Sequence, residues 1–103
     1  MIRGTTPKLK FGVPFNPTVC KQIWITFSQD NREIFTIYKD DCTLTSTDIT
    51  ARLSQRQTLS LSSAYQVQIQ IRVAFDGLPD ETALASEIIT TSVGKLLRDG
   101  VIE

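Results

Sequence analysis

The clearest indication of the fold is the segment Tyr65–Phe75, which reads Tyr-Gln-Val-Gln-Ile-Gln-Ile-Arg-Val-Ala-Phe. Its large apolar side chains share one parity, and its polar side chains share the other together with Ala74. This alternation has the period of two of a β-strand with one buried and one wet face, and β-branched and aromatic residues suit such a surface. Burial of the apolar row would contribute on the order of 10 kcal/mol before entropy is subtracted. We therefore predict the central strand of an antiparallel sheet.

Composition restricts the class of protein. The chain has 103 residues, of which 41% are hydrophobic and 21% are charged, as in an ordinary soluble domain. Eleven basic and eleven acidic residues give a net charge of zero, whereas a nucleic-acid binder needs a clustered basic excess. No run approaches the ~18 apolar residues of a membrane span, and no signal-peptide core opens the chain. We expect one domain over residues 1–103, made in the cytoplasm, with neither nucleic-acid nor membrane partners.

The residues needed for catalysis are scarce. There is no histidine, the commonest general base and metal ligand. Cys20 and Cys42 are expected to stay reduced in the cytosol, with a disulfide between them as the alternative, and neither has a histidine to activate it. The sequence has no Gly-x-Ser-x-Gly elbow, P-loop or Gly-x-Gly-x-x-Gly motif. The carboxylates at 40–48 and 76–81 lack the spacing of a calcium loop and suit solvated turns. We expect no enzyme activity, no cofactor and no metal.

Strand-like patterns recur along the rest of the chain. The further predicted strands are 6–13, 21–28, 33–38, 42–44, 49–53 and 83–93. A short polar turn at 29–32 predicts a hairpin. Ser54–Gln57 matches the Ser-x-x-Gln capping box and predicts one helical turn. Residues 1–5 form either an extended arm or a short edge strand.

Many short strands with almost no helical period predict an all-β fold, a single antiparallel β-sandwich of about seven strands that is immunoglobulin-like in architecture. Tyr65 occupies the place of the tyrosine corner of such sandwiches. The buried Cys–Trp–Cys set of antibody domains is missing, because Val67 stands two residues after the tyrosine.

Several apolar residues are candidates for an interface. Trp24 lies on the polar parity of its strand, where it is either an exposed anchor or covered by a loop or the tail. Strand 33–38 is apolar on both parities, so it is either covered on both sides or contacts a partner. The C-terminal tail, residues 95–103, either packs on the domain or forms a contact arm. The polar row 66–72 is expected to be a wet sheet face, with a bound partner as the alternative. The candidate interface residues are Trp24, Phe35, Ile37, Tyr38, Leu96, Leu97, Val101 and Ile102.

Short motifs suggest a kinship. They are Arg3-Gly4-Thr5-Thr6-Pro7, Pro14-Phe15, Thr26-Phe27-Ser28-Gln29, Asp41-Cys42-Thr43-Leu44, Ile71-Arg72, Ile88-Ile89-Thr90-Thr91 and Val93-Gly94. In these motifs, which span nearly the whole chain, the protein resembles small structural proteins encoded by phages and prophages of Gram-positive bacteria. The inferred strand order is distantly similar to the immunoglobulin-like N-terminal domain of phage baseplate upper proteins. The resemblance implies a component of the tail or baseplate region and defines no functional residues.

We therefore expect a non-enzymatic structural or assembly protein of a phage particle. It would contact other phage structural proteins, form a homo-oligomer or join a larger assembly, and reside in the host cytoplasm and then in the virion. The alternative is a ligand-binding β-sandwich module that recognises carbohydrate or protein through exposed aromatic residues such as Trp24 and Tyr38.

Overall fold

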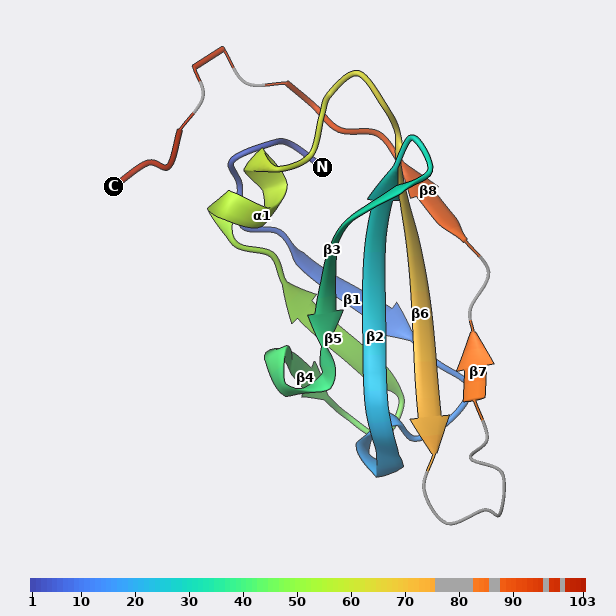
Figure 1. Cartoon of the computed structure of the whole chain (residues 1–103). Coiled ribbons are helices and arrows are strands. Elements are labelled where there is room, and N and C mark those ends of the chain that lie inside the picture. Colours follow the sequence, from blue (N-terminus) through green and yellow to red (C-terminus); the bar gives the residue numbers. More distant parts are fainter. Residues whose placement is uncertain (76–82, 86–87, 96, 99) are drawn as a thin grey trace.

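The chain folds as two antiparallel β-sheets that pack face to face, which confirms the predicted β-sandwich (Figure 1). The computed structural model describes residues 1–75, 83–85, 88–95, 97–98 and 100–103. The strands are β1 (Lys8–Gly12), β2 (Cys20–Gln29), β3 (Arg32–Tyr38), β4 (Cys42–Leu44), β5 (Asp48–Arg52), β6 (Val67–Phe75), β7 (Ala83–Ala85) and β8 (Ile89–Thr91). The helical turns are η1 (Pro17–Val19), η2 (Lys39–Asp41) and α1 (Gln55–Leu59).

The larger sheet has the order β3-β2-β6-β7, and β8 also pairs with β6. The smaller sheet has the order β1-β5-β4. Figure 1 shows the long strands β2 and β6 side by side in front of β1 and β5. The core between the sheets is filled by side chains of alternate residues from both sheets, as the period of two in a β-strand requires. Its buried members include Ile23, Ile25, Phe27, Ile49, Ala51, Leu53, Val67, Ile69, Ile71 and Val73.

The predicted central strand is present, but the prediction that Tyr65 belongs to its buried row was wrong. β6 begins at Val67, and Tyr65 is 50% exposed. The buried Gln29 explains this boundary, because its amide binds the loop before β6. Its Nε2 donates to the carbonyl oxygens of Ser62 (2.8 Å) and Tyr65 (3.1 Å), and its Oε1 accepts from the N–H of Ser62 (2.8 Å). These hydrogen bonds hold the backbone of Ser62 and Tyr65 in the loop, so the pairing of β6 with β2 starts only after residue 65.

The predicted hairpin at 29–32 joins β2 and β3. Asp30 and Asn31 both have positive φ, 50° and 60°, as a two-residue type I′ turn requires. A β-bulge follows, since Phe27 pairs with Phe35 whereas Ser28 pairs with Glu33. One extra residue of β3 therefore lies in the bulge, and the facing of the strand changes there. Because the facing changes at the bulge, apolar residues on both parities of β3 can be at least partly covered. Tyr38, at the end of the strand, is exposed.

The prediction of a single strand over 83–93 was wrong, because this segment contains two strands, β7 and β8. Ala85 pairs with Arg72 and Ile89 with Ile69, so four steps along this segment correspond to three steps along β6. β7 and β8 are consequently separate strands with registers that differ by one residue. A one-residue shift in register reverses which residues of a strand face each side of the sheet, so the two pairings do not belong to one regular strand.

The N-terminus lies beside the C-terminal segment, with an isolated parallel bridge between Ile2 and Gly94, and a turn follows at Arg3 and Gly4. The Gly94 N–H donates to the carbonyl of Met1 (2.6 Å), and Nη2 of Arg3 donates to the carbonyl of Leu59 at the end of α1 (2.9 Å). A Cβ on Gly94 would lie 3.1 Å from Cγ1 of Ile2, so this close approach favours glycine. The capping box predicted for α1 is confirmed, with both reciprocal hydrogen bonds present.

Candidate functional site

Three large side chains form a line across the outer face of the larger sheet. Trp24 on β2 is directly opposite Tyr38 on β3 and directly opposite Arg72 on β6. Their neighbours along each strand, such as Ile23 and Ile25, point into the core, so the parity of the strands places all three on the solvent side. We call Tyr38, Trp24 and Arg72 the contact row.

The contact row is held together by contacts between its own members. The rings of Trp24 and Tyr38 meet edge to face, with centroids 6.3 Å apart and an interplanar angle of 87°. The guanidinium carbon of Arg72 lies over the indole, 5.4 Å from its centroid. Such pairs contribute roughly 0.5–1.5 kcal/mol each at partly exposed sites. Trp24 is nevertheless 42% exposed and Tyr38 48% exposed. The row is therefore both accessible and preorganised.

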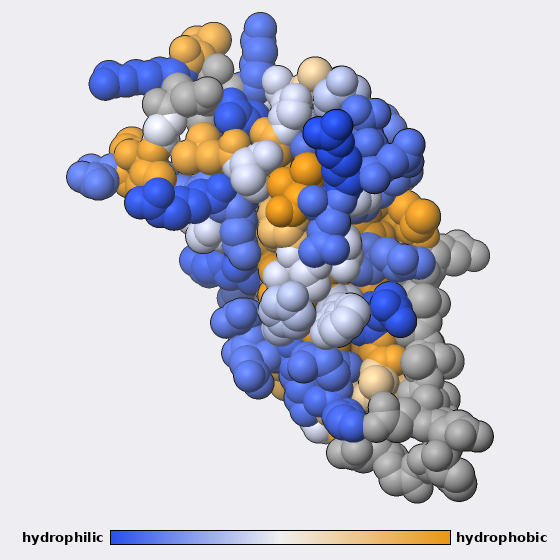
Figure 2. Space-filling model, viewed as in Figure 1, coloured by the Kyte–Doolittle hydropathy of each residue, from blue (hydrophilic) through white to orange (hydrophobic). Residues whose placement is uncertain are grey.

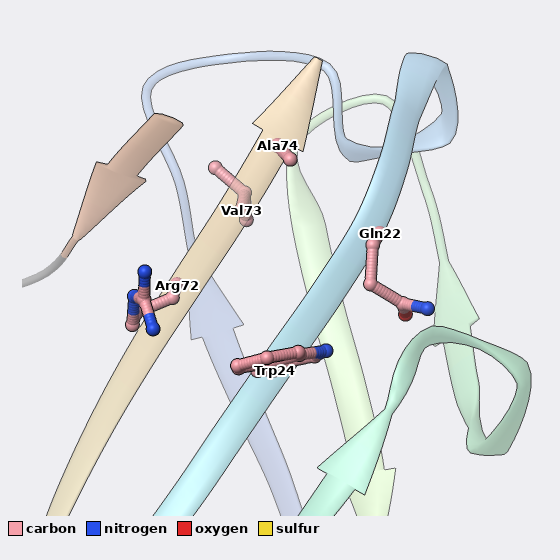
Figure 3. Close-up of a pocket in the computed structure, with 5 residues that line it drawn as sticks. All are labelled: Gln22, Trp24, Arg72, Val73 and Ala74. Atoms are coloured by element: carbon pink, nitrogen blue, oxygen red, sulfur yellow. The ribbon is translucent and has the colours of Figure 1, made fainter. Parts of the chain in front are cut away.

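A shallow open pocket of about 150 Å³ lies beside the row. Figure 3 shows the residues that line it, which are Gln22, Trp24, Arg72, Val73 and Ala74. The Gln22 side chain is oriented by its Oε1, which accepts from the backbone N–H of Ile23 (3.0 Å) and of Lys39 (3.3 Å). The pocket thus has one fixed amide, one guanidinium and an aromatic wall.

Hydroxyl and amide side chains surround the row on the same face. Thr26, one step further along the face, lies opposite Thr36 and Gln70. The two threonine hydroxyl oxygens are 3.3 Å apart, and the Thr36 hydroxyl donates to Oε2 of Glu33 (2.8 Å). Figure 2 shows side chains of intermediate hydropathy across the middle of this face, with hydrophilic side chains beside them and some hydrophobic ones above and to the right. An aromatic centre with a polar rim is the usual arrangement of a protein interface.

Two predicted interface residues lie on the inner side of the sheet. Ile37 is only 3% exposed and belongs to the core. Phe35 is half-buried and stacks on Phe27 with ring centroids 4.5 Å apart. The β-bulge at Ile34 sets which parity of β3 faces inward, and simple alternation then places Phe35 and Ile37 on the face opposite to Tyr38. Neither side chain therefore contributes to the contact row.

The apolar residues of the tail are separate from the contact row. Leu97 is 99% exposed, Ile102 79% and Val101 38%, and Leu96 lies outside the described residues. Gln55 of α1 holds the end of the tail, since its Oε1 accepts from the N–H of Ile102 (2.7 Å) and its Nε2 donates to the Ile102 carbonyl (3.1 Å). Figure 1 shows the tail extending past α1 and away from the sheets.

The cysteines are both free and are poor nucleophiles. Burial raises the pKa of the Cys20 thiol, although Lys39 opposes the shift. Burial also raises the pKa of the Cys42 thiol, and the charge of Asp41 adds to it. Both side chains are therefore protonated thiols at neutral pH. Among the described residues there is no cluster of three or more metal-ligating side chains, and none of their helices has the length and apolarity to cross a membrane.

The sequence interpretation named Trp24 and Tyr38 but did not name Arg72 or Gln22 as site residues. Arg72 was assigned to the polar row 66–72, for which a wet sheet face was expected and a bound partner was the alternative. Its contact with Trp24 depends on the register between β2 and β6, which a period-two pattern leaves open.

Comparison with protein-family models, with curated proteins and with solved structures gave no match.

Proposed function

We propose that this chain is a non-enzymatic structural or assembly protein of a phage or prophage particle, in the tail or baseplate region, and that it acts through protein–protein contacts made by the contact row. The assignment to a phage is supported by the motif resemblance described above. The contact function is supported by one observation, which is that a tyrosine, a tryptophan and an arginine lie side by side and exposed on a sheet face.

These three residue types are the ones enriched among interface hot spots. The enrichment has a physical cause, because each buries a large apolar area on contact and also carries a polar group for orientation. In the contact row the side chains already pack on one another. Binding a partner would therefore cost little additional side-chain conformational entropy. The hydroxyl and amide side chains of Thr26, Thr36 and Gln70 supply a rim that tolerates water.

Carbohydrate binding is the second candidate, because the exposed Trp24 also suits stacking on a sugar. Two features of the row weaken it. The Arg72 guanidinium covers one face of the indole, and the Tyr38 ring stands nearly perpendicular to it. The two aromatic rings therefore do not form one flat platform on which a sugar could lie.

The experiment compares Trp24→Ala with Tyr65→Ala, a matched control at a tyrosine that is exposed but outside the row. Self-association is followed by light scattering across a wide concentration range, and association with particles is followed by co-sedimentation with phage released from a host that encodes the chain. We expect Trp24→Ala to weaken association at least roughly 30-fold, as for a hot spot of about 2 kcal/mol, and Tyr65→Ala to have little effect. A wild-type protein that stays monomeric and does not sediment with particles would refute the proposal, and binding in a glycan array would favour the second candidate.

A further inference from the structure

In the part of the chain that the structure describes, the smaller sheet ends in a strand, β1, with an open edge. Among the described residues β1 pairs only with β5. The hydrogen bonds from the Leu53 N–H to the Pro7 carbonyl (3.0 Å) and from the Val13 N–H to the Thr47 carbonyl (2.9 Å) set the phase of this ladder. In an antiparallel pair, alternate residues direct their N–H and C=O groups toward the partner strand and away from it. The backbone groups of Lys8, Lys10 and Gly12 therefore point to the open edge.

A groove runs along this edge between β1 and β8, with a volume of about 440 Å³. Its lining residues are Met1, Pro7, Lys8, Leu9, Lys10, Phe11, Ile69, Ile89 and Thr91. The apolar members come from both sheets, because Leu9 and Phe11 are half-buried on β1 and Ile89 is 43% exposed on β8. The groove is thus a place where an apolar side chain can reach the margin of the core.

The outer face of the same edge is basic. Lys8 lies directly opposite Arg52 on β5, and both side chains are exposed. Neither forms an ion pair within the described part of the chain, whereas Nζ of Lys10 lies 3.7 Å from Oδ2 of Asp48. An edge lysine alone is ordinary protection against unwanted strand pairing. Two like charges directly opposite are unfavourable in a sheet, however, and their repulsion would be relieved by an anionic partner.

We propose that the β1 edge binds an extended segment of another protein, in which acidic and apolar residues alternate, and that this segment adds to the smaller sheet as a strand. Residues opposite one another on adjacent strands point to the same face. Side chains opposite Lys8 and Lys10 would lie beside these two lysines, on the same face as Arg52, and would match the basic face if they are acidic. Side chains opposite Leu9 and Phe11 would enter the groove and match it if they are apolar. Addition of a peptide strand to an open sheet edge is a common mode of recognition.

Two other occupants fit less well. In the C-terminal tail of a second copy, Leu97, Asp99, Val101 and Glu103 share one parity, so acidic and apolar residues would fall on the same face. A nucleic acid would meet the cations of this edge but would leave the apolar groove without a function, and the chain has no net positive charge. The surface is also distinct from the contact row, so this inference stands or fails independently of the proposed function.

The test uses a capped seven-residue peptide of alternating glutamate and valine, with calorimetry and with amide hydrogen exchange followed by NMR. We expect saturable binding, slower exchange at Lys8, Lys10 and Gly12, and no binding of the same peptide with lysine in place of glutamate. Lys8→Glu should weaken binding roughly tenfold, whereas the matched control Lys95→Glu, an exposed lysine of the tail, should leave it unchanged. Lys8→Glu removes the repulsion with Arg52, so it does not endanger the fold.

Ile89→Glu provides a second variant that tests the groove at a side chain that is already partly exposed, and it should also weaken binding. Equal binding of the glutamate and lysine peptides, equal binding by wild type and Lys8→Glu, or no protection of the β1 amides would overturn the proposal. Competition by a short single-stranded DNA, with wild-type affinity retained in Ile89→Glu, would overturn it in favour of a purely electrostatic site.

Discussion

Gln29 allows the sharpest test of how the central strand is positioned. Its side chain is 4% exposed and makes three hydrogen bonds to the backbone of the loop before β6, at 2.8, 3.1 and 2.8 Å. In Gln29→Ala these three bonds are lost, and the backbone groups of Ser62 and Tyr65 lose a protein partner. At about 1 kcal/mol per bond, with some of the loss recovered from water, the free energy of unfolding should fall by about 2–3 kcal/mol. That is a large part of the ~5–15 kcal/mol that stabilises a domain.

Urea unfolding measures this change. With an m-value of about 1–1.5 kcal/mol/M, the urea midpoint should fall by about 1.3–3 M at unchanged m. Gln68→Ala, on the exposed face of β6, is the control and should change stability by less than about 0.5 kcal/mol. Gln29→Glu adds a chemical test, because its carboxylate cannot donate to the two carbonyls. The folded state should raise the pKa of this carboxyl, so the variant should gain stability as the pH falls from 7 towards 5. A Gln29→Ala protein within 0.5 kcal/mol of wild type would refute the role of this side chain.

Three further predictions concern the core, the open edge and the thiols. Phe27→Ala should destabilise the protein by about 3–5 kcal/mol in urea unfolding, because the fully buried ring stacks on its neighbour; a loss below 1 kcal/mol would mean that the core is not packed in this way. Lys8→Glu should raise the urea midpoint by an amount equivalent to about 0.2–1 kcal/mol, because the like-charge pair with Arg52 becomes an attractive one. High salt should reduce this gain in stability. Iodoacetamide should modify Cys20 and Cys42 slowly at pH 7 and faster as the pH approaches and passes 9, because burial raises both thiol pKa values from the ordinary value of 9.0. Rapid modification of the native protein at pH 7 would contradict the burial of these thiols.

The sequence by itself determined the local structure. Alternation over 65–75 predicted the strand that the structure shows from Val67, together with its buried face. The polar residues 29–32 predicted the hairpin, and Ser54–Gln57 predicted the capped turn of α1. Each of these features depends on residues that are neighbours in the chain, and period or turn chemistry encodes them directly. The exposure of Trp24 was left open, although its parity was correct.

The tertiary structure alone decided how the strands register with one another and what they bring together. The bulge in β3 moved Ile37 into the core, and the amide of Gln29 excluded Tyr65 from β6. The register of β2 against β6 brought Arg72 over Trp24 and created the contact row. The physical reason is that a strand with one apolar face can slide by two residues against its partner without changing which face is buried. Register is therefore chosen by the packing of the whole core and by loop contacts, neither of which is encoded in any single stretch of the chain.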